Sequence, residues 1–140
     1  MSLLDHTLAC LRIWGDELVP EEVSGLLGAL PSRSCIKGET TWTCSRTGAQ
    51  RIAKTGSWRL EVREQNPGDL NAQIDELFAL LSDDPEIWAQ LQSRFELDLF
   101  CGLFMGSSND SEAISPRNLR LLGERGIELR LEIYSALEDE

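Results

Sequence analysis

The sequence predicts an α+β fold: a two-layer α/β sandwich of the ferredoxin-like, split βαβ type, with a two-helix insert and a largely antiparallel sheet. Apolar and polar residues alternate in segments 7–14, 58–63, 95–103 and 127–133, as in strands that are buried on one face. Helical spacing of apolar residues separates these segments, and a strand–helix–strand pattern occurs near both ends of the chain. A more open mixed sheet is the alternative.

The first strand and helix have clear boundaries. Alternation runs from Thr7 to Trp14 and ends at Gly15. Pro20 suits the first turn of a helix, where its missing N–H needs no partner. Gly28 is a typical helix stop, so the sequence predicts a helix that begins at Pro20 and ends near Gly28.

Residues 40–56 allow two interpretations. Thr40–Ser45 has strand propensity, and Gly48 could turn the chain back through residues 51–53 to form a hairpin. A mobile loop fits equally well. The strand over residues 58–63 then follows, with Trp58 on its buried side.

A pair of helices is predicted between the second and third main strands. Asp69 is a cap candidate before the apolar stripe of residues 70–81, and Asp84-Pro85 starts a second helix. Because two helices reverse the chain twice, we expect the strands on either side of the pair to run antiparallel. Ser115-Pro116 opens a last helix with Gly126 as its stop, and residues 127–133 form the closing strand.

Composition indicates one domain spanning residues 1–140. The first residues carry neither a basic start nor an apolar run, so we expect no signal peptide. The sequence contains no run of ~20 apolar residues, so we also expect no membrane segment and a cytoplasmic location. Its four cysteines form no C-x-x-C pair, and we expect all of them to be reduced. With His6 as the single histidine, we expect neither a metal site nor a cofactor.

Charge is distributed unevenly along this acidic chain, whose formal net charge is −11. Residues 33–63 hold seven basic against two acidic residues, whereas residues 64–113 hold eleven acidic residues against Arg94. If the two segments lie on opposite sides of the fold, the protein is a strong dipole that steers a charged partner. A plain solvated surface is the alternative. The acidic total disfavours a nucleic-acid partner, although Trp42 and Trp58 lie in the basic segment.

Two turns are the candidate ligand site. Glycine in Lys37-Gly38-Glu39 allows a tight turn that could present Lys37 to an anion, and Asp16 lies in the turn after the first strand. Asp16, Lys37 and Glu39 are therefore the candidate ligand-binding residues, while ion pairing between these turns and the neighbouring strands is the structural alternative. No enzyme motif supplies catalytic residues.

The polar face of the sheet is the candidate interaction surface. Charged residues dominate that face, and opposite charges across strands stabilise a sheet. Apolar residues also occur on it, and such residues often mark a contact surface. The candidate interaction residues are Trp14, Arg59, Phe100 and Phe104.

The early motif carries a family resemblance. Gly15-Asp16-x-Leu18-x-Pro20-Glu21-Glu22-Val23-Ser24, followed by Lys37-Gly38-Glu39 and a strand tryptophan at Trp58, resembles the uncharacterised bacterial family catalogued as domain of unknown function 4279. The later layout is similar mainly in pattern. The resemblance implies a small bacterial single-domain protein and supplies no catalytic residues.

These observations favour a non-catalytic protein-interaction domain. One concrete version is an immunity-type protein that neutralises a basic toxin. The alternative is a small anionic-ligand-binding or enzymatic pocket near the Gly15-Asp16 and Lys37-Gly38-Glu39 turns. A homodimer that forms through the open sheet face is a third hypothesis.

Overall fold

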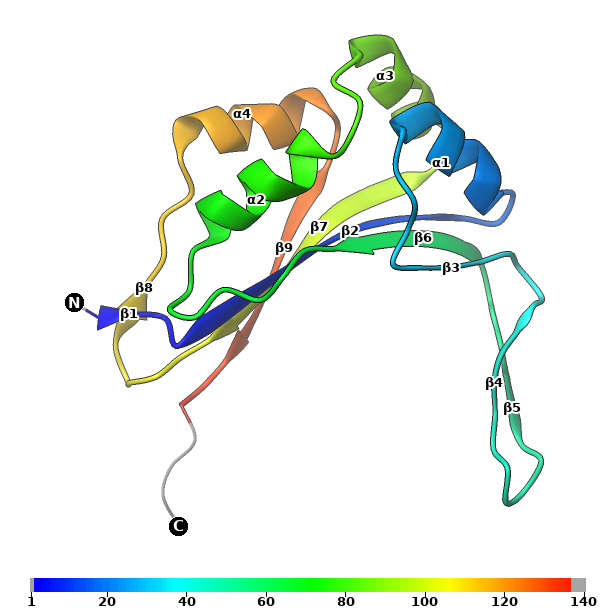
Figure 1. Cartoon of the computed structure of the whole chain (residues 1–140), viewed down its shortest axis with the longest axis horizontal. Helices are drawn as coiled ribbons and strands as arrows, with labels where there is room; N and C mark the ends of the chain where they lie inside the picture. The colour runs from blue at the N-terminus through cyan, green and yellow to red at the C-terminus, as the bar shows by residue number, and fades with distance from the viewer. Residues whose placement is uncertain (1, 137–140) are drawn as a thin grey trace.

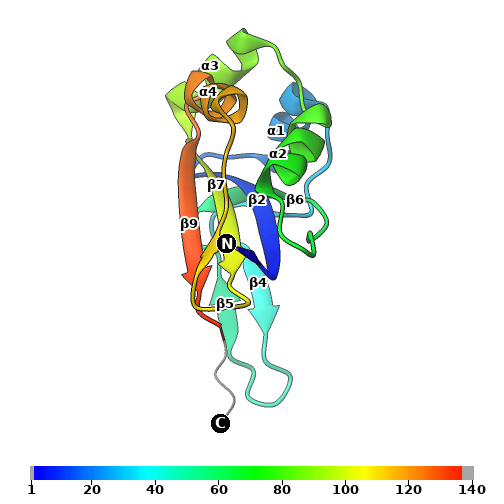
Figure 2. The same cartoon turned by 90° about the vertical axis from the view of Figure 1, so that its left-hand side faces the viewer.

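The computed structural model describes residues 2–136, in which one five-stranded sheet carries all four helices on a single face (Figures 1 and 2). The acidic tail over residues 137–140 lies outside this range. The elements are β1 (Ser2–Leu3), β2 (His6–Gly15), α1 (Pro20–Leu27), β3 (Arg33–Cys35), β4 (Thr40–Thr43), β5 (Gln50–Ile52), β6 (Gly56–Glu61), α2 (Leu70–Ala79), α3 (Pro85–Arg94), β7 (Glu96–Phe104), β8 (Asp110–Ser111), α4 (Pro116–Glu124) and β9 (Glu128–Tyr134).

The main sheet has the order β3-β6-β2-β7-β9. Every neighbouring pair is antiparallel except β7 and β9, which run parallel. The α+β class and the largely antiparallel sheet are therefore confirmed. No helix within the described residues is both long enough and apolar enough to cross a membrane.

The split βαβ unit does not end in the strand over residues 58–63, which is the next clearly alternating segment after the first predicted helix. It consists of β2, α1 and β3, with β6 inserted between the two strands. β6 runs antiparallel to β2 because the β4–β5 hairpin reverses the chain before β6 begins.

The expected polarity across the two-helix insert is wrong. Both β6 and β7 pair antiparallel with β2, so they run in the same direction on either side of it. The helices α2 and α3 thus carry the chain across β2 instead of returning it to an adjacent strand. At the C-terminal end, α4 connects β7 to β9, and these two strands are parallel neighbours in the sheet.

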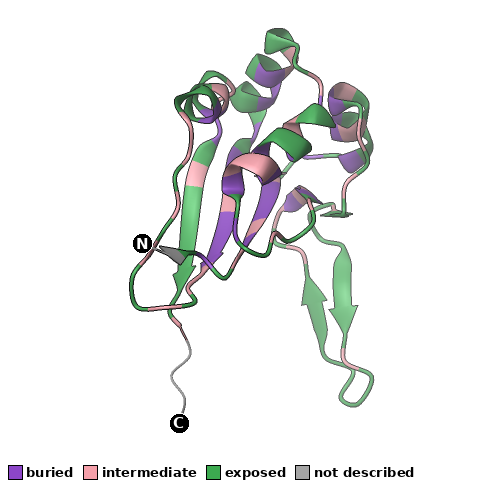
Figure 3. Ribbon diagram, turned by 60° about the vertical axis from the view of Figure 1, so that its left-hand side comes forward, coloured by how far each residue is buried: buried purple, intermediate pink, exposed green. Residues whose placement is uncertain are grey.

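The hairpin interpretation of residues 40–56 is confirmed. β4 and β5 pair antiparallel, and the turn between them contains Gly48 with a positive φ of 76°. The hairpin projects away from the main sheet on the side opposite the helices (Figure 1). Its strand residues are exposed (Figure 3).

The caps predicted for the helices are largely confirmed. Asp69, Asp84 and Ser115 each accept a backbone N–H with the side chain, and α1 ends at Gly28 in the left-handed region. Each of the three N-cap side chains stabilises its helix by ~0.5–2 kcal/mol. The end of α4 is followed by Gly126, which also has a positive φ.

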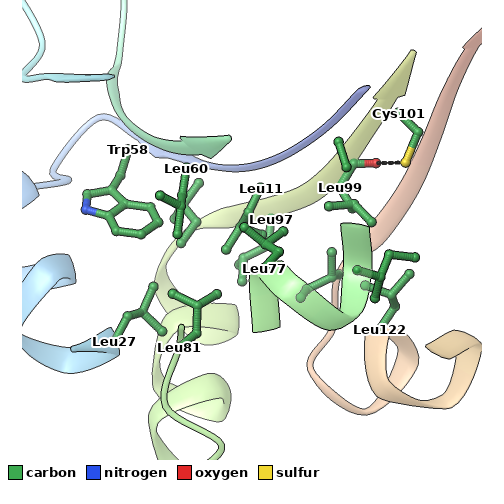
Figure 4. Packing of buried hydrophobic residues seen from close by; sticks show 14 of the residues in the cluster. Leu11, Leu27, Trp58, Leu60, Leu77, Leu81, Leu97, Leu99, Cys101 and Leu122 are labelled. Carbon is green, nitrogen blue, oxygen red and sulfur yellow. Dashed lines mark hydrogen bonds between the residues drawn. The ribbon is translucent and has the colours of Figure 1, made fainter. Parts of the chain in front are cut away.

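The core lies between the sheet and the helix layer (Figure 4). Two tryptophans are almost fully buried there, and each indole N–H has an acceptor: Ser24 Oγ for Trp58, at 3.0 Å, and the carbonyl oxygen of Ser82 for Trp88, at 2.7 Å. Satisfying these donors matters because a buried unpaired N–H costs ~1–3 kcal/mol.

One buried polar residue, Gln73, connects α2 to the sheet through hydrogen bonds. The Gln73 amide donates to the carbonyl oxygens of Thr7, at 2.9 Å, and Arg63, at 3.0 Å. Its Oε1 accepts from Thr7 Oγ1 at 2.7 Å. Gln73 therefore holds the helix layer in one position over β2, a role that helical periodicity does not reveal.

Candidate functional site

The open face of the sheet carries a continuous row of charged residues across five strands. The cross-strand register places Arg33, Arg59, Arg12, Asp98 and Glu128 side by side, in that order. All of these side chains lie on the face opposite the helices, because they share the phase of the half-exposed residues of β2 and β6. The row changes sign from positive at β3, β6 and β2 to negative at β7.

Asp98 is the anchor of this row. Its side chain is 0% exposed, although it lies on the open, polar face of the sheet. It is buried because Arg12 pairs with it from the next strand, with Nε and Nη2 at 2.7 and 2.6 Å from the two carboxylate oxygens. Arg130 adds a third donor at 3.3 Å. The hydrogen bond to Asp98 raises the pKa of Arg12, so this guanidinium stays charged.

Aromatic rings extend the open face beside this charged pair. The Arg12 guanidinium lies 4.7 Å from the ring centre of Phe100 and 5.8 Å from that of Trp14. Phe104 is stacked between His6 and Tyr134, with ring centres 3.9 and 4.4 Å away. Phe100 and Phe104 are thus partly covered by neighbouring side chains of the same chain. Of the four candidate interaction residues, Trp14 and Arg59 line the adjoining cleft.

A cleft of about 1000 Å³ lies in the angle between the open face and the β4–β5 hairpin. It is lined by β2, β3, β4, β6 and residues around β5. Trp14 from the sheet and Trp42 from the hairpin contribute aromatic surface. The charged residues that line it are Arg12, Arg33, Arg51, Lys54 and Arg59, with Glu39 as the acidic member.

Three of these cations have no carboxylate partner within residues 2–136. Arg12 is paired with Asp98, and Arg33 lies 3.4 Å from Glu61. Arg51, Lys54 and Arg59 form no ion pair with any described residue; Arg51 instead lies 5.7 Å from the ring centre of Trp42. The cleft therefore has a net positive potential in a protein that is acidic as a whole.

The three candidate ligand-binding residues are only partly brought together. Lys37 Nζ lies 3.1 Å from Asp16 Oδ2, and this hydrogen bond, followed by one to Thr55, lowers the pKa of the exposed Asp16 carboxyl. Glu39 accepts from the Ile36 N–H at 3.1 Å, which closes its own turn, and it lines the cleft. Asp16 lies instead in a separate shallow hollow beside Phe95.

The four cysteines are free thiols. Burial raises the pKa of Cys10 to about 11 and that of Cys101 to about 12, which makes both thiols inert at neutral pH. Cys35 lines the cleft with Sγ 3.3 Å from Ser57 Oγ. No group of three or more metal-ligating side chains converges within the described part of the chain.

The sequence pattern does not single out Arg51 and Lys54 as site residues. The excess of basic residues over 33–63 points to this segment, but Arg51 and Lys54 line the cleft only because the hairpin folds toward the open face. A local pattern of residues does not determine that direction.

A comparison with models of known protein families identifies the family of this chain. The model of a domain of unknown function, DUF4279, matches residues 5–136. The chain belongs to this family. No curated protein and no solved structure gave a significant match.

The matched range covers the whole candidate site of this DUF4279 domain. It includes both faces of the main sheet, the β4–β5 hairpin and all sixteen residues that line the cleft. The cleft is therefore part of the domain that the family model describes.

Proposed function

We propose that this DUF4279 domain is a non-catalytic protein-interaction domain whose cationic cleft binds an acidic segment of a partner protein. The observation that carries the proposal is the set of three cations without a carboxylate partner among the described residues, Arg51, Lys54 and Arg59, which surround a cleft of about 1000 Å³. Carboxylates of the partner would supply the missing ion pairs, and Trp42 and Trp14 would pack against its apolar groups.

Two features favour a chain segment over a small anion. The lining residues extend across several strands and both walls of the cleft, so a single small anion would meet few of them at once. Lys37, the cation of the candidate small-ligand site, is already paired with Asp16. A pocket for a small anion near these turns is the alternative function, with Glu39 at its edge.

The test uses a fluorescein-labelled glutamate-rich peptide and fluorescence anisotropy. We expect binding that weakens as salt increases, because exposed ion pairs are screened beyond a Debye length of about 8–10 Å. Arg51→Glu and Arg59→Glu should each weaken binding at least about tenfold, given that charge reversal changes attraction to repulsion. Arg120→Glu on the exposed face of α4 is the matched control and should bind like the wild type.

Competitors then separate the alternatives. Inorganic phosphate that displaces the peptide at stoichiometric concentration would favour the small-anion pocket. A single-stranded oligonucleotide that binds more tightly than the peptide, with the same sensitivity to Arg59→Glu, would contradict the proposal. Equal binding by wild type and both cleft variants would remove the cleft as the site.

A second candidate function comes from the opposite side of the molecule. The segment over residues 69–94 holds six exposed carboxylates, and its single cation, Arg94, is paired with Glu22. This acidic helix surface would suit a basic partner, as in an immunity-type protein that neutralises a basic toxin. Reversing Glu76 and Glu86 to lysine should abolish binding of a basic test protein such as cytochrome c if this surface is the interface.

We further propose a cytoplasmic location. Four free thiols support it, because cysteines stay reduced in that compartment. A fractionation experiment with an epitope-tagged chain would test this, and recovery in a secreted fraction would contradict it. A bacterial source remains an expectation from the family resemblance.

A further inference from the structure

The outer edge of β9 is the starting point of a second proposal, which is independent of the cleft. β9 is the edge strand of the main sheet, and among residues 2–136 it pairs with β7 alone. The carbonyl oxygen of Tyr134 accepts from Met105 on the β7 side, so alternate residues of β9 direct their backbone groups in the opposite direction. Leu129, Leu131 and Ile133 therefore present their N–H and C=O groups to the free edge.

The same strand exposes apolar side chains on the helix-facing side. Leu131 is 47% exposed and Ile133 is 63% exposed, while the preceding Leu129 packs against the core. The helix layer thus covers the first half of β9 and leaves the second half open (Figure 3). An edge strand with exposed aliphatic residues favours strand pairing with another chain.

The sequence of β9 is complementary to itself when it is read antiparallel. If Leu131 pairs with Leu131 of a second copy, Arg130 lies opposite Glu132 twice, and Leu129 lies opposite Ile133 twice. Leu131, Leu129 and Ile133 then occupy the hydrogen-bonded positions that their outward backbone groups require, while Arg130 and Glu132 occupy the closer, non-hydrogen-bonded positions. Both pairs also keep their side chains on matching faces of the sheet.

The neighbouring registers are disfavoured by charge. A shift by two residues in one direction places Arg130 opposite Arg130, and a shift in the other direction places Glu132 opposite Glu132. A shift by one residue would bring the apolar face of one strand beside the charged face of the other. The strand therefore specifies one register for self-association.

We propose that the protein forms a two-fold symmetric dimer in which the β9 strands of two copies pair antiparallel around Leu131. The two sheets then form one continuous sheet with the helices of both copies on one side and both clefts on the other. Arg130 retains its contacts with Asp98 and Glu128, because a guanidinium has five N–H donors and these contacts use only part of them.

Sedimentation equilibrium tests the dimer from micromolar to near-millimolar protein. We expect the mass to rise with concentration from the 15.7 kDa of one chain to twice that value. Glu132→Lys and Arg130→Glu should each raise the dimer dissociation constant at least about tenfold, because each creates two like-charged pairs. Glu76→Lys, the same charge change on an exposed position of α2, should leave the dissociation constant unchanged.

Mixing the two variants gives the sharpest outcome. In a heterodimer of Glu132→Lys with Arg130→Glu, every cross-strand pair again has opposite charges, so an equimolar mixture should dimerise like the wild type. If Arg130→Glu unfolds through its proximity to Asp98, Leu131→Asp replaces it: this exposed position would bring two carboxylates together at the two-fold axis and should also abolish the dimer.

Three results would overturn the proposal. The wild type could remain monomeric at every concentration, or the dimer could persist in folded Glu132→Lys and Leu131→Asp. Loss of the dimer in Arg59→Glu but not in Glu132→Lys would place the interface on the open sheet face instead. None of these results depends on whether the cleft binds an acidic segment.

Discussion

Replacing Arg12 by methionine should remove the partner that allows Asp98 to be buried. The Asp98 side chain is 0% exposed, and Arg12 supplies two short hydrogen bonds at 2.6 and 2.7 Å. Arg130 would remain as a single donor at 3.3 Å. Breaking a buried pair from one side typically costs ~3–5 kcal/mol, which is a large part of the ~5–15 kcal/mol that stabilises a domain.

A double-mutant cycle measured by urea unfolding tests this account. Asp98→Leu should cost less than Arg12→Met, because the Arg12 side chain is 23% exposed and can direct its charge to water, whereas the Asp98 side chain is fully buried. The double variant Arg12→Met/Asp98→Leu should recover most of the loss, to within ~1 kcal/mol of the wild type, since no unpaired charge is then buried. Arg117→Met, which breaks an exposed ion pair with Asp75, is the control and should change little.

Additive losses of stability in the double variant would refute this account. If the double variant loses the sum of the two single losses, Arg12 and Asp98 act independently and the carboxylate is not held in place by this pair. A loss in Arg12→Met no larger than that in Arg117→Met would refute it as well.

Three further predictions concern other parts of the fold. Gln73→Leu should lower the free energy of unfolding by ~1–3 kcal/mol, because it removes the acceptor of the buried Thr7 hydroxyl and the side-chain donor to the carbonyl oxygen of Arg63. Gly56→Ala should destabilise the fold by ~1–3 kcal/mol, since the added Cβ would lie 2.8 and 2.9 Å from two backbone carbonyl oxygens. Gly25→Ala is the matched control in α1, where the added Cβ meets nothing within 4 Å, and it should stabilise the fold by ~0.5–1 kcal/mol. Ellman's reagent at pH 8 should modify Cys44 first, because hydrogen bonds from Thr47 lower the pKa of this thiol and raise its thiolate fraction, while Cys101, with a pKa of about 12, should react only on unfolding.

Each of these predictions has a clear contrary result. Urea midpoints that do not separate Gly56→Ala from Gly25→Ala would contradict the close approach of the backbone at residue 56. A fast thiol phase that persists in Cys44→Ser would assign the reactive thiol elsewhere. Wild-type stability in Gln73→Leu would show that α2 is fastened to the sheet by its apolar face alone.

Local pattern predicts the elements well because each depends on residues close in sequence. Alternation at residues 7–14 and 127–133 corresponds to β2 and β9, and the caps at Asp69 and Asp84 are satisfied by N–H groups two or three residues away. The α+β class follows from the same signals. The identity of the split βαβ unit does not, because it depends on how the hairpin at residues 40–52 redirects the chain.

The candidate site could be predicted only in part for the same reason. Trp14, Arg59, Phe100 and Phe104 share the open face as their phase indicates. The burial of Asp98 depends on Arg12, which is 86 residues away in sequence, and periodicity carries no information about such a pair. The same applies to Arg51 and Lys54, whose place in the cleft is set by the orientation of the hairpin.

The central position of β2 has a consequence for synthesis of the chain. This strand precedes both of its partners in the chain, because β6 and β7 end at residues 61 and 104. The ribosome must therefore add residues 16–104 after β2 before both edges of this strand can be paired. Folding thus depends on contacts between segments that are distant in sequence, which slows it. Until β7 is complete, at least one edge of this apolar strand stays unpaired in the nascent chain, and we expect the yield of the protein in the cell to depend on chaperones that shield such segments.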